Sequence, residues 1–151
     1  MTSILIAGPG EEPVSLAEAK AWCRIDLGDE DAMLAALIAA ARLHVESLTG
    51  LALVTQTWRL LLEAPPLLVG LPVAPVSALL VAPDGAVLQG DAVLLAGPVD
   101  SLSIDYTAGY GGADDVPADL KQAVLFLVAY WFENCDALTT APAPVERLLA
   151  S

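Results

Sequence analysis

Basic side chains are scarce in this sequence, which has six lysines and arginines against 19 aspartates and glutamates. The formal net charge at neutral pH is −13. Proteins that grip DNA or an anionic membrane use clustered lysines and arginines to neutralise phosphates, and this chain has too few of them. We therefore expect no specific DNA binding and no membrane attachment. An acidic surface instead repels DNA that passes close to it.

Long hydrophobic runs are absent as well. The longest uninterrupted apolar runs, residues 32–41 and 123–132, have ten residues each, about half of what a membrane-spanning helix needs. No lysine or arginine precedes the short apolar stretch near the N-terminus, so we expect no secretory signal.

Cysteine and histidine are too rare to suggest a chemical site. Cys23 and Cys135 lie far apart in the sequence, and they are expected to be buried thiols in a reducing compartment rather than a disulfide. The single histidine, His44, has no nearby serine, cysteine or aspartate in a triad-like arrangement. We expect it to be a structural helix residue rather than a general base, and we expect no metal or cofactor.

Apolar residues, in contrast, are abundant. They make up 56% of the 151 residues, and only 17% are charged. A chain of this length is expected to form one domain, and a single small domain cannot easily cover so much apolar surface. The surplus indicates burial between subunits. The alternative is a monomer that is simply rich in alanine and leucine.

The helix signals are clear. Ser15 and Glu18 form a capping box, which predicts a short helix running to about Cys23. A second helix is expected to start in residues 29–31 and to end at Gly50, where glycine suits the left-handed capping position. Its predicted apolar stripe has helical spacing: Leu34, Leu37, Ile38, Ala41, Val45 and Leu48. A third helix, residues 117–134, starts at Pro117 and is apolar on nearly every face, so it should be central.

Strand signals occupy the middle of the chain. Residues 52–63 and 101–107 read as strands, and the latter alternates Leu102, Ile104 and Tyr106 with polar residues. Asp84-Gly85 predicts a hairpin between residues 78–81 and 86–88, and Gly90-Asp91 and Gly97-Pro98 bound two more short strands.

The predicted fold class is α+β in a single domain, residues 1–151. It has a mainly helical core, made of two N-terminal helices and a long C-terminal helix, with a small antiparallel sheet inserted between them. Residues 1–12 are expected to be a flexible arm, residues 64–100 a β-rich insertion and residues 137–151 a tail.

Three candidate ligand sites have simpler explanations. The Gly109-Tyr110-Gly111-Gly112 loop follows a strand and precedes a helix, but Asp114 and Asp115 would repel a phosphate there, so we interpret it as a flexible turn. The acidic residues 26 and 29–31 lack the spacing of a calcium loop, and helix capping accounts for them. The three tryptophans are expected to anchor the core or an interface rather than a ligand: Trp22, Trp58 and Trp131.

Two stretches resemble a known family. Residues 12–63 (EPVSLAEAKAWCRID, EDAMLAALIAAARLHVESLTG, LALVTQTWRL) are similar to the N-terminal half of the head–tail connector, or adaptor, family of long-tailed phages. Residues 104–134 (IDYTAGYGGADDVPADLKQAVLFLVAYWFEN) are similar to its C-terminal half. Gene transfer agents, which are phage-derived particles, carry related rings.

The resemblance implies a structural protein rather than an enzyme, in the neck of a phage or gene transfer agent particle made in the bacterial cytoplasm. Its implied partners are copies of itself in a dodecameric ring, the portal protein, and a tail-side completion or terminator protein. DNA would pass through the ring without being specifically bound.

Contact with the portal or with neighbouring subunits is expected at the 109–115 loop and in the tail. The expected contact residues are Tyr110, Gly111, Asp114, Asp115, Val145, Arg147, Leu148 and Leu149. Val145, Leu148 and Leu149 would place a short helix in a groove of the portal.

Two rival functions stay open from the sequence. One is a tail terminator or other tail-completion protein, which shares the setting of particle assembly. The other is a small acidic hydrolase or ligand-binding domain, which would need a polar pocket around His44 or Asp105.

Overall fold

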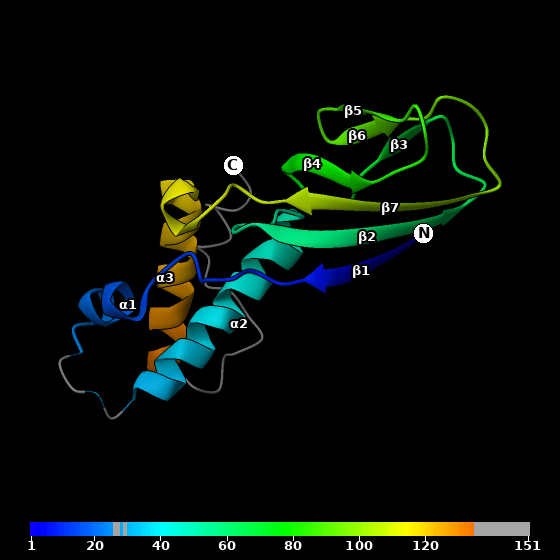
Figure 1. Ribbon diagram of the computed structural model, residues 1–151. Helices are drawn as coiled ribbons and strands as arrows, with labels where there is room; N and C mark the ends of the chain where they lie inside the picture. Colours follow the sequence, from blue (N-terminus) through cyan, green and yellow to red (C-terminus); the bar gives the residue numbers. More distant parts are fainter. Residues whose placement is uncertain (26–27, 29, 135–151) are drawn as a thin grey trace. The chain divides into compact units, whose positions relative to one another are not determined.

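Contacts between residues divide the chain into a β unit and a helical unit. The computed structural model describes residues 1–25, 28 and 30–134 (Figure 1). The β unit comprises Met1–Gly10 and Gly50–Gly111, and the helical unit comprises Glu11–Thr49 and the chain from Gly112 onward. We expected one domain from the length of the chain.

The helical unit begins with the predicted capping box. The Glu18 N–H donates to Ser15 Oγ at 3.0 Å, and the Ser15 N–H donates to Glu18 Oε1 at 3.3 Å. These bonds satisfy two N–H groups that a helix start would otherwise leave open, and they confirm where α1 (Leu16–Cys23) starts. Arg24 ends it in a left-handed conformation.

Helix α2 (Asp31–Thr49) contacts α3 (Ala118–Glu133), and together they supply most of this unit's buried residues. The predicted stripe is buried from Leu34 to Val45, but Leu48 is exposed, so the prediction was wrong for its last member. Leu48 keeps the helical spacing of the stripe, but no other described residues cover it in the last turn of α2. By length and composition α2 could also cross a membrane, a property that buried core helices share.

Helix α3 is buried on more than one face, as its composition predicted. Ala123, Val124 and Leu125 are consecutive and all buried, and Trp131 is almost fully buried near its end. Pro117 caps the helix from just outside it rather than occupying its first turn. A short 3₁₀ helix, η1 (Ala113–Asp115), precedes it.

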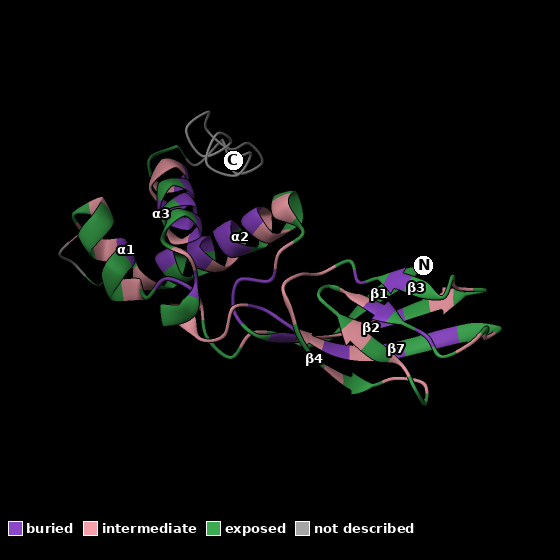
Figure 2. Ribbon diagram, turned by 90° about the horizontal axis from the view of Figure 1, so that it is seen from above, coloured by how far each residue is buried: buried purple, intermediate pink, exposed green. Residues whose placement is uncertain are grey.

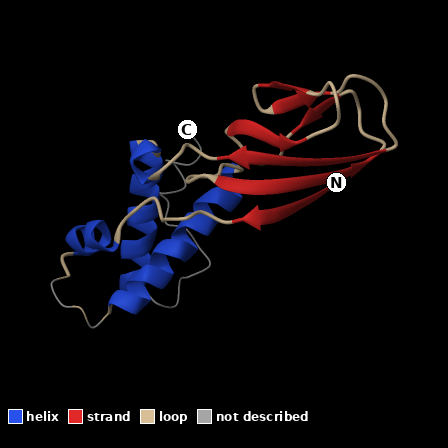
Figure 3. Ribbon diagram, in the orientation of Figure 1, coloured by secondary structure: helices blue, strands red, loops and turns tan. Residues whose placement is uncertain are grey.

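The β unit contains two antiparallel sheets in the described residues (Figure 3). The larger has the order β1-β2-β7-β4 and the smaller β3-β6-β5. Their bounds are β1 Thr2–Ala7, β2 Gln56–Glu63, β3 Leu68–Gly70, β4 Val76–Val81, β5 Val87–Gln89, β6 Ala92–Leu94 and β7 Ser101–Ala108. The buried residues of both sheets form one apolar cluster, in which Leu60, Ile104 and Tyr106 pack with Val69 and Val93.

The N-terminus is not a flexible arm. Residues 2–7 form β1, which pairs antiparallel with β2. The sequence Thr-Ser-Ile-Leu-Ile-Ala has the β-branched and apolar residues that suit a strand, and Gly8-Pro9-Gly10 follows it as a break. Its paired residues on β2 are at least 50 positions away in the sequence, which is why the local sequence left the strand unassigned.

The hairpin predicted at Asp84-Gly85 was also wrong. A turn is present there, with Gly85 at φ 79°, but β4 before it pairs with β7 and β5 after it pairs with β6. Gly90-Asp91 instead forms the turn of the β5–β6 hairpin. Turn residues reverse the chain locally, while partner choice depends on which apolar faces meet.

The α+β class is confirmed, but the predicted layout is correct only in part. The β portion is not a small sheet inserted between helices, because it has two sheets and begins before the first helix. Strand β2 starts at Gln56 rather than at residue 52, since Ala52, Leu53 and Val54 are buried outside any strand. The alternation predicted for the last strand is confirmed by the buried Leu102, Ile104 and Tyr106.

Candidate assembly surfaces

Exposed residues occur in both units (green in Figure 2), and many of them are large and apolar. Those of the β unit are Met1, Ile4, Leu5, Ile6, Leu61, Leu67, Leu68, Leu80, Val81, Val87 and Leu94. Those of the helical unit are Trp22, Met33, Leu43, Leu48 and Phe126. Single exposed apolar residues are ordinary, but groups of them mark surfaces that bind other proteins.

Three groups of exposed apolar residues stand out. Two of them lie on opposite edges of the four-stranded sheet: β1 carries Ile4, Leu5 and Ile6, and β4 carries Leu80 and Val81. The third is an aromatic pair in the helical unit. Trp22 of α1 meets Phe126 of α3 edge-on, with ring centroids 5.3 Å apart, and both rings stay more than a third exposed. Exposed aromatic pairs of this kind are typical anchors of protein interfaces.

The 109–111 segment is held in place, contrary to the expected flexible turn. The Gly109 N–H donates to Pro75 O at 2.9 Å, and the Tyr110 N–H donates to Leu53 O at 3.3 Å. The Gly111 carbonyl accepts from the N–H of Thr55 at 3.0 Å. Gly109 has φ 128°, and a side chain there would meet the Thr55 backbone at 2.7 Å, so only glycine fits.

The 112–115 segment belongs to the helical unit and is equally well bonded. The Gly112 N–H donates to Asp115 Oδ2 at 3.0 Å, and the Ala113 N–H donates to Glu11 Oε1 at 2.8 Å. Carboxylates therefore occupy the N–H groups that a phosphate would need. Of the predicted contact residues, Tyr110 and Gly111 lie in the β unit, whereas the exposed Asp114 and Asp115 lie in the helical unit.

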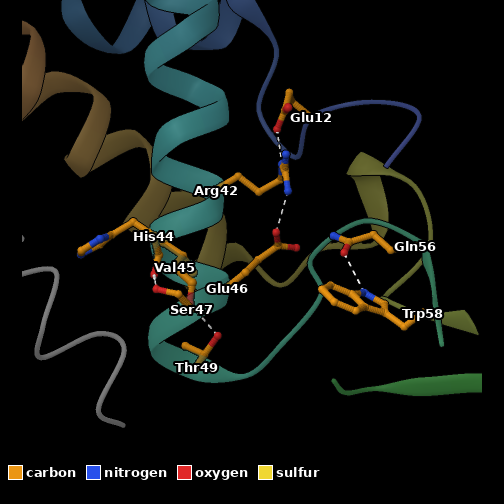
Figure 4. Close-up of polar contacts among 9 residues, drawn as sticks. All are labelled: Glu12, Arg42, His44, Val45, Glu46, Ser47, Thr49, Gln56 and Trp58. Atoms are coloured by element: carbon orange, nitrogen blue, oxygen red, sulfur yellow. Dashed lines mark hydrogen bonds and ion pairs between the residues drawn. The ribbon is translucent and has the colours of Figure 1, made fainter. Parts of the chain in front are cut away.

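Among the described residues, Arg42 of α2 is the most buried charged residue, and Figure 4 shows its polar contacts. Its Nε donates to Glu12 Oε2 at 2.6 Å, and its Nη1 donates to Glu46 Oε1 at 2.6 Å. Burial lowers the pKa of Arg42, but the hydrogen bonds and charges of the two glutamates outweigh it and raise the pKa above its ordinary value. Through Glu12, these contacts attach the segment that precedes α1 to helix α2. Sequence reasoning missed it, although Glu46 lies four residues from Arg42 on one helix face.

His44 and Asp105, the residues of the enzyme alternative, each have a structural partner. The His44 ring meets Trp131 edge-on at a centroid distance of 5.7 Å. Asp105 accepts two hydrogen bonds from Arg59, at 2.7 and 2.9 Å, and these bonds lower the pKa of its carboxyl. His44 belongs to the helical unit and Asp105 to the β unit.

The other candidates have structural environments as well. Trp131 is a core residue, and Trp58 is half-buried with its indole N–H donating to Gln56 Oε1 at 3.1 Å. Burial, followed by the charge of Glu133, raises the pKa of the Cys23 thiol, so this thiol is poorly reactive.

Asp31 forms an ion pair with Lys20. Within residues 1–25, 28 and 30–134, no three His, Cys, Asp or Glu side chains gather as metal ligands. Val145, Arg147, Leu148, Leu149 and Cys135 lie outside the described residues, as do residues 26 and 29.

Comparison with known proteins gives a consistent result. The family model of phage gp6-like head–tail connector proteins matches residues 13–89. A chain in the virion of a native gene transfer agent particle has a TM-score of 0.84 and 27% identity, covering 99% of this chain and 94% of that chain. Chains in two particle necks are also similar. One, from an empty particle computed with C6 symmetry, has TM-score 0.83, 26% identity and coverage of 99% and 93%. The other, from a native particle computed with C12 symmetry, has TM-score 0.81, 25% identity and coverage of 99% and 93%. A search of curated proteins found no match.

Proposed function

This chain belongs to the phage gp6-like head–tail connector family, and from that premise we propose that it is a non-catalytic ring subunit in the neck of a phage or gene transfer agent particle. Its function is to connect head and tail. The observation that carries the proposal is the extent of the fold likeness. Nearly the whole chain, 99%, superposes on chains from gene transfer agent particles, and 93–94% of those chains is covered in return.

A ring of identical subunits agrees with the apolar surface. The similar necks were computed with C6 and C12 symmetry, which a ring of copies around the particle axis satisfies. The exposed β-sheet edges and the Trp22–Phe126 pair supply apolar surface that neighbouring copies would cover. A ring of twelve copies is the number that we propose.

The charge of the chain suits a DNA channel. With a net charge of −13 per chain, a ring would present an acidic wall that DNA does not stick to. DNA would thus pass through without being specifically bound, and sequence recognition is not part of the proposed role.

We assign the contacts with the portal and with neighbouring subunits to the residues predicted from the sequence. Tyr110 and Gly111 are fixed by backbone hydrogen bonds, and Asp114 and Asp115 are exposed. Val145, Arg147, Leu148 and Leu149 would contribute the portal-binding tail. Deleting residues 143–151 tests this assignment. The shortened chain should stay folded and fail to attach to portal, whereas a shortened chain that still joins heads to tails would contradict it.

Removing the gene from a particle-producing strain tests the function itself. Filled heads and separate tails should accumulate, because the joint between them is missing, and electron microscopy would show both. The intact gene supplied in trans should restore joined particles. Normally joined particles in the deletion strain would overturn the proposal.

His44→Ala is the matched test of the non-catalytic role. Because the His44 ring packs edge-on against Trp131 within the described residues, the variant should fold and restore joined particles as well as the wild type. A folded His44→Ala chain that enters particles but blocks their completion would indicate chemistry at this residue.

A further inference from the structure

The outer strands of the four-stranded sheet carry no charge. β1 reads Thr-Ser-Ile-Leu-Ile-Ala and β4 reads Val-Ser-Ala-Leu-Leu-Val, whereas the inner strands β2 and β7 carry Arg59, Glu63 and Asp105. Sheets that must stay single place charges or proline on their outer strands, since an open apolar edge pairs readily with another strand. The outer strands of this sheet contain neither charge nor proline, although each has a register shift along its length. Their uncharged edges suit a sheet that is continued by another strand.

Strand β1 is incomplete as a packed element. All six of its residues are exposed, including Ile4 at 41%. It is bonded to β2 along one side, and within the described part of the chain no strand lies along its other side (Figure 1). An apolar strand exposed on both faces gains little from its own fold, so a second strand beside it would add both hydrogen bonds and buried area.

Strand β4 offers the complementary side. It pairs only with β7 among the described strands. Asp91 Oδ1 accepts from the Val76 N–H at 2.9 Å. This hydrogen bond occupies the N–H of the first residue of β4, so a further strand would not bond there. The last two residues, Leu80 and Val81, are 56% and 57% exposed.

Strand direction and register allow the two edges to meet. The four strands alternate in direction, so β1 and β4 run antiparallel to each other. Ile4 pairs with Arg59, Arg59 with Asp105, and Asp105 with Val81. Directly opposed residues share a face of the sheet. These four side chains therefore form one row across the sheet, with the ion pair at its centre and an apolar residue at each end.

We infer that β1 of one subunit pairs antiparallel with β4 of the next, so that the four-stranded sheets join into one continuous sheet around the ring. This rests on the proposed ring function. A second copy is the occupant because the same sheet supplies both uncharged edges and because the row then continues with Ile4 beside Val81. Such a head-to-tail contact uses two different surfaces and can close into a ring, whereas a two-fold β1–β1 contact stops at a dimer.

Disulfide trapping in the full-length chain tests the pairing. Cys23→Ser and Cys135→Ser first remove the native thiols, and Ile4→Cys and Val81→Cys are then combined in one chain. Opposed residues on neighbouring antiparallel strands lie at a separation that a disulfide can span. Mild oxidation of concentrated protein should give a ladder of dimers, trimers and larger species on a non-reducing gel. Each single variant should give none of these products.

The matched control pairs Val81→Cys with Leu61→Cys. Leu61 is similarly exposed but lies on β2, an inner strand, so this pair should not form the ladder. The inference is overturned by a ladder of equal strength in the control, by dimers from Ile4→Cys alone, or by no crosslinking in a double variant whose thermal unfolding matches the wild type. The two proposals fail separately: a chain that joins heads to tails without this crosslink keeps the connector function and loses the continuous sheet.

Discussion

The two units differ in where they place their charged side chains. The helical unit buries Arg42 between Glu12 and Glu46, so its charges hold its own segments together. The β unit keeps Arg59 and Asp105 on its inner strands and leaves its outer strands uncharged. The helical unit thus uses charge for its own stability, whereas the β unit leaves apolar edges for neighbours.

Arg42→Met should have the largest effect. It leaves two carboxylates near each other without their shared cation, and breaking a buried ion pair costs about 3 kcal/mol of unfolding free energy or more. Urea unfolding followed by circular dichroism would measure the loss. Adding Glu12→Gln and Glu46→Gln should recover most of it, because no unpaired charge then remains. A loss below about 1 kcal/mol, as for an exposed pair, would show that the cluster contributes little.

Gly109→Ala should break the β unit by sterics alone. Its φ of 128° is unfavourable for alanine, and the new Cβ would lie 2.7 Å from backbone atoms of Thr55, which cannot rotate away. We expect a loss of about 2 kcal/mol or more in unfolding free energy. Gly97→Ala is the control, because nothing lies within 4 Å of its added carbon. Equal stability of the two variants would contradict this account of the 109–111 segment.

Ser15→Ala should cost less, about 1 kcal/mol, because it removes one helix cap. The Glu18 N–H loses its acceptor, while the core of the helical unit is untouched. Ser47→Ala is the control, since Ser47 Oγ donates only to the carbonyl of His44 in its own helix. The midpoint temperature of thermal unfolding should be lower for Ser15→Ala than for Ser47→Ala. If the two midpoints are equal, the capping box does not determine where α1 starts.

The same contrast explains what the sequence could predict. Helix ends and stripes depend on residues three or four apart, so the Ser15–Glu18 box, the Leu34–Val45 stripe and the Gly50 cap were all found. Strand partners do not depend on neighbours in sequence. β1 was therefore taken for an arm, and the Asp84-Gly85 turn was assigned to the wrong pair of strands.

Long-range ion pairs were hidden for the same reason. Arg59 and Asp105 are 46 residues apart, and Arg42 and Glu12 are 30 apart. No local pattern connects them. The family resemblance could still be predicted, and its first stretch lies almost entirely within the matched residues 13–89. The second stretch, residues 104–134, lies beyond that match, and its support comes from the fold likeness over 99% of the chain.

Asp105→Asn should have the smallest effect and should depend on pH. The hydrogen bonds from Arg59 lower the pKa of Asp105 below its ordinary value of 3.8 in the folded chain. As the pH falls, Asp105 therefore takes up a proton in the unfolded chain before it does so in the folded chain. The stabilisation by the Arg59–Asp105 pair is complete above the ordinary pKa of the carboxyl and disappears as the pH falls through its pKa in the folded chain. Urea midpoints measured from neutral pH down to about pH 3 should fall less steeply for Asp105→Asn than for the wild type. Gly97→Ala, which changes no titratable group, should keep the wild-type slope.

Because the pair lies on inner strands, disulfide trapping between Ile4→Cys and Val81→Cys should persist in the Asp105→Asn chain. Loss of the ladder there would mean that the central ion pair, and not only the uncharged edges, aligns neighbouring sheets.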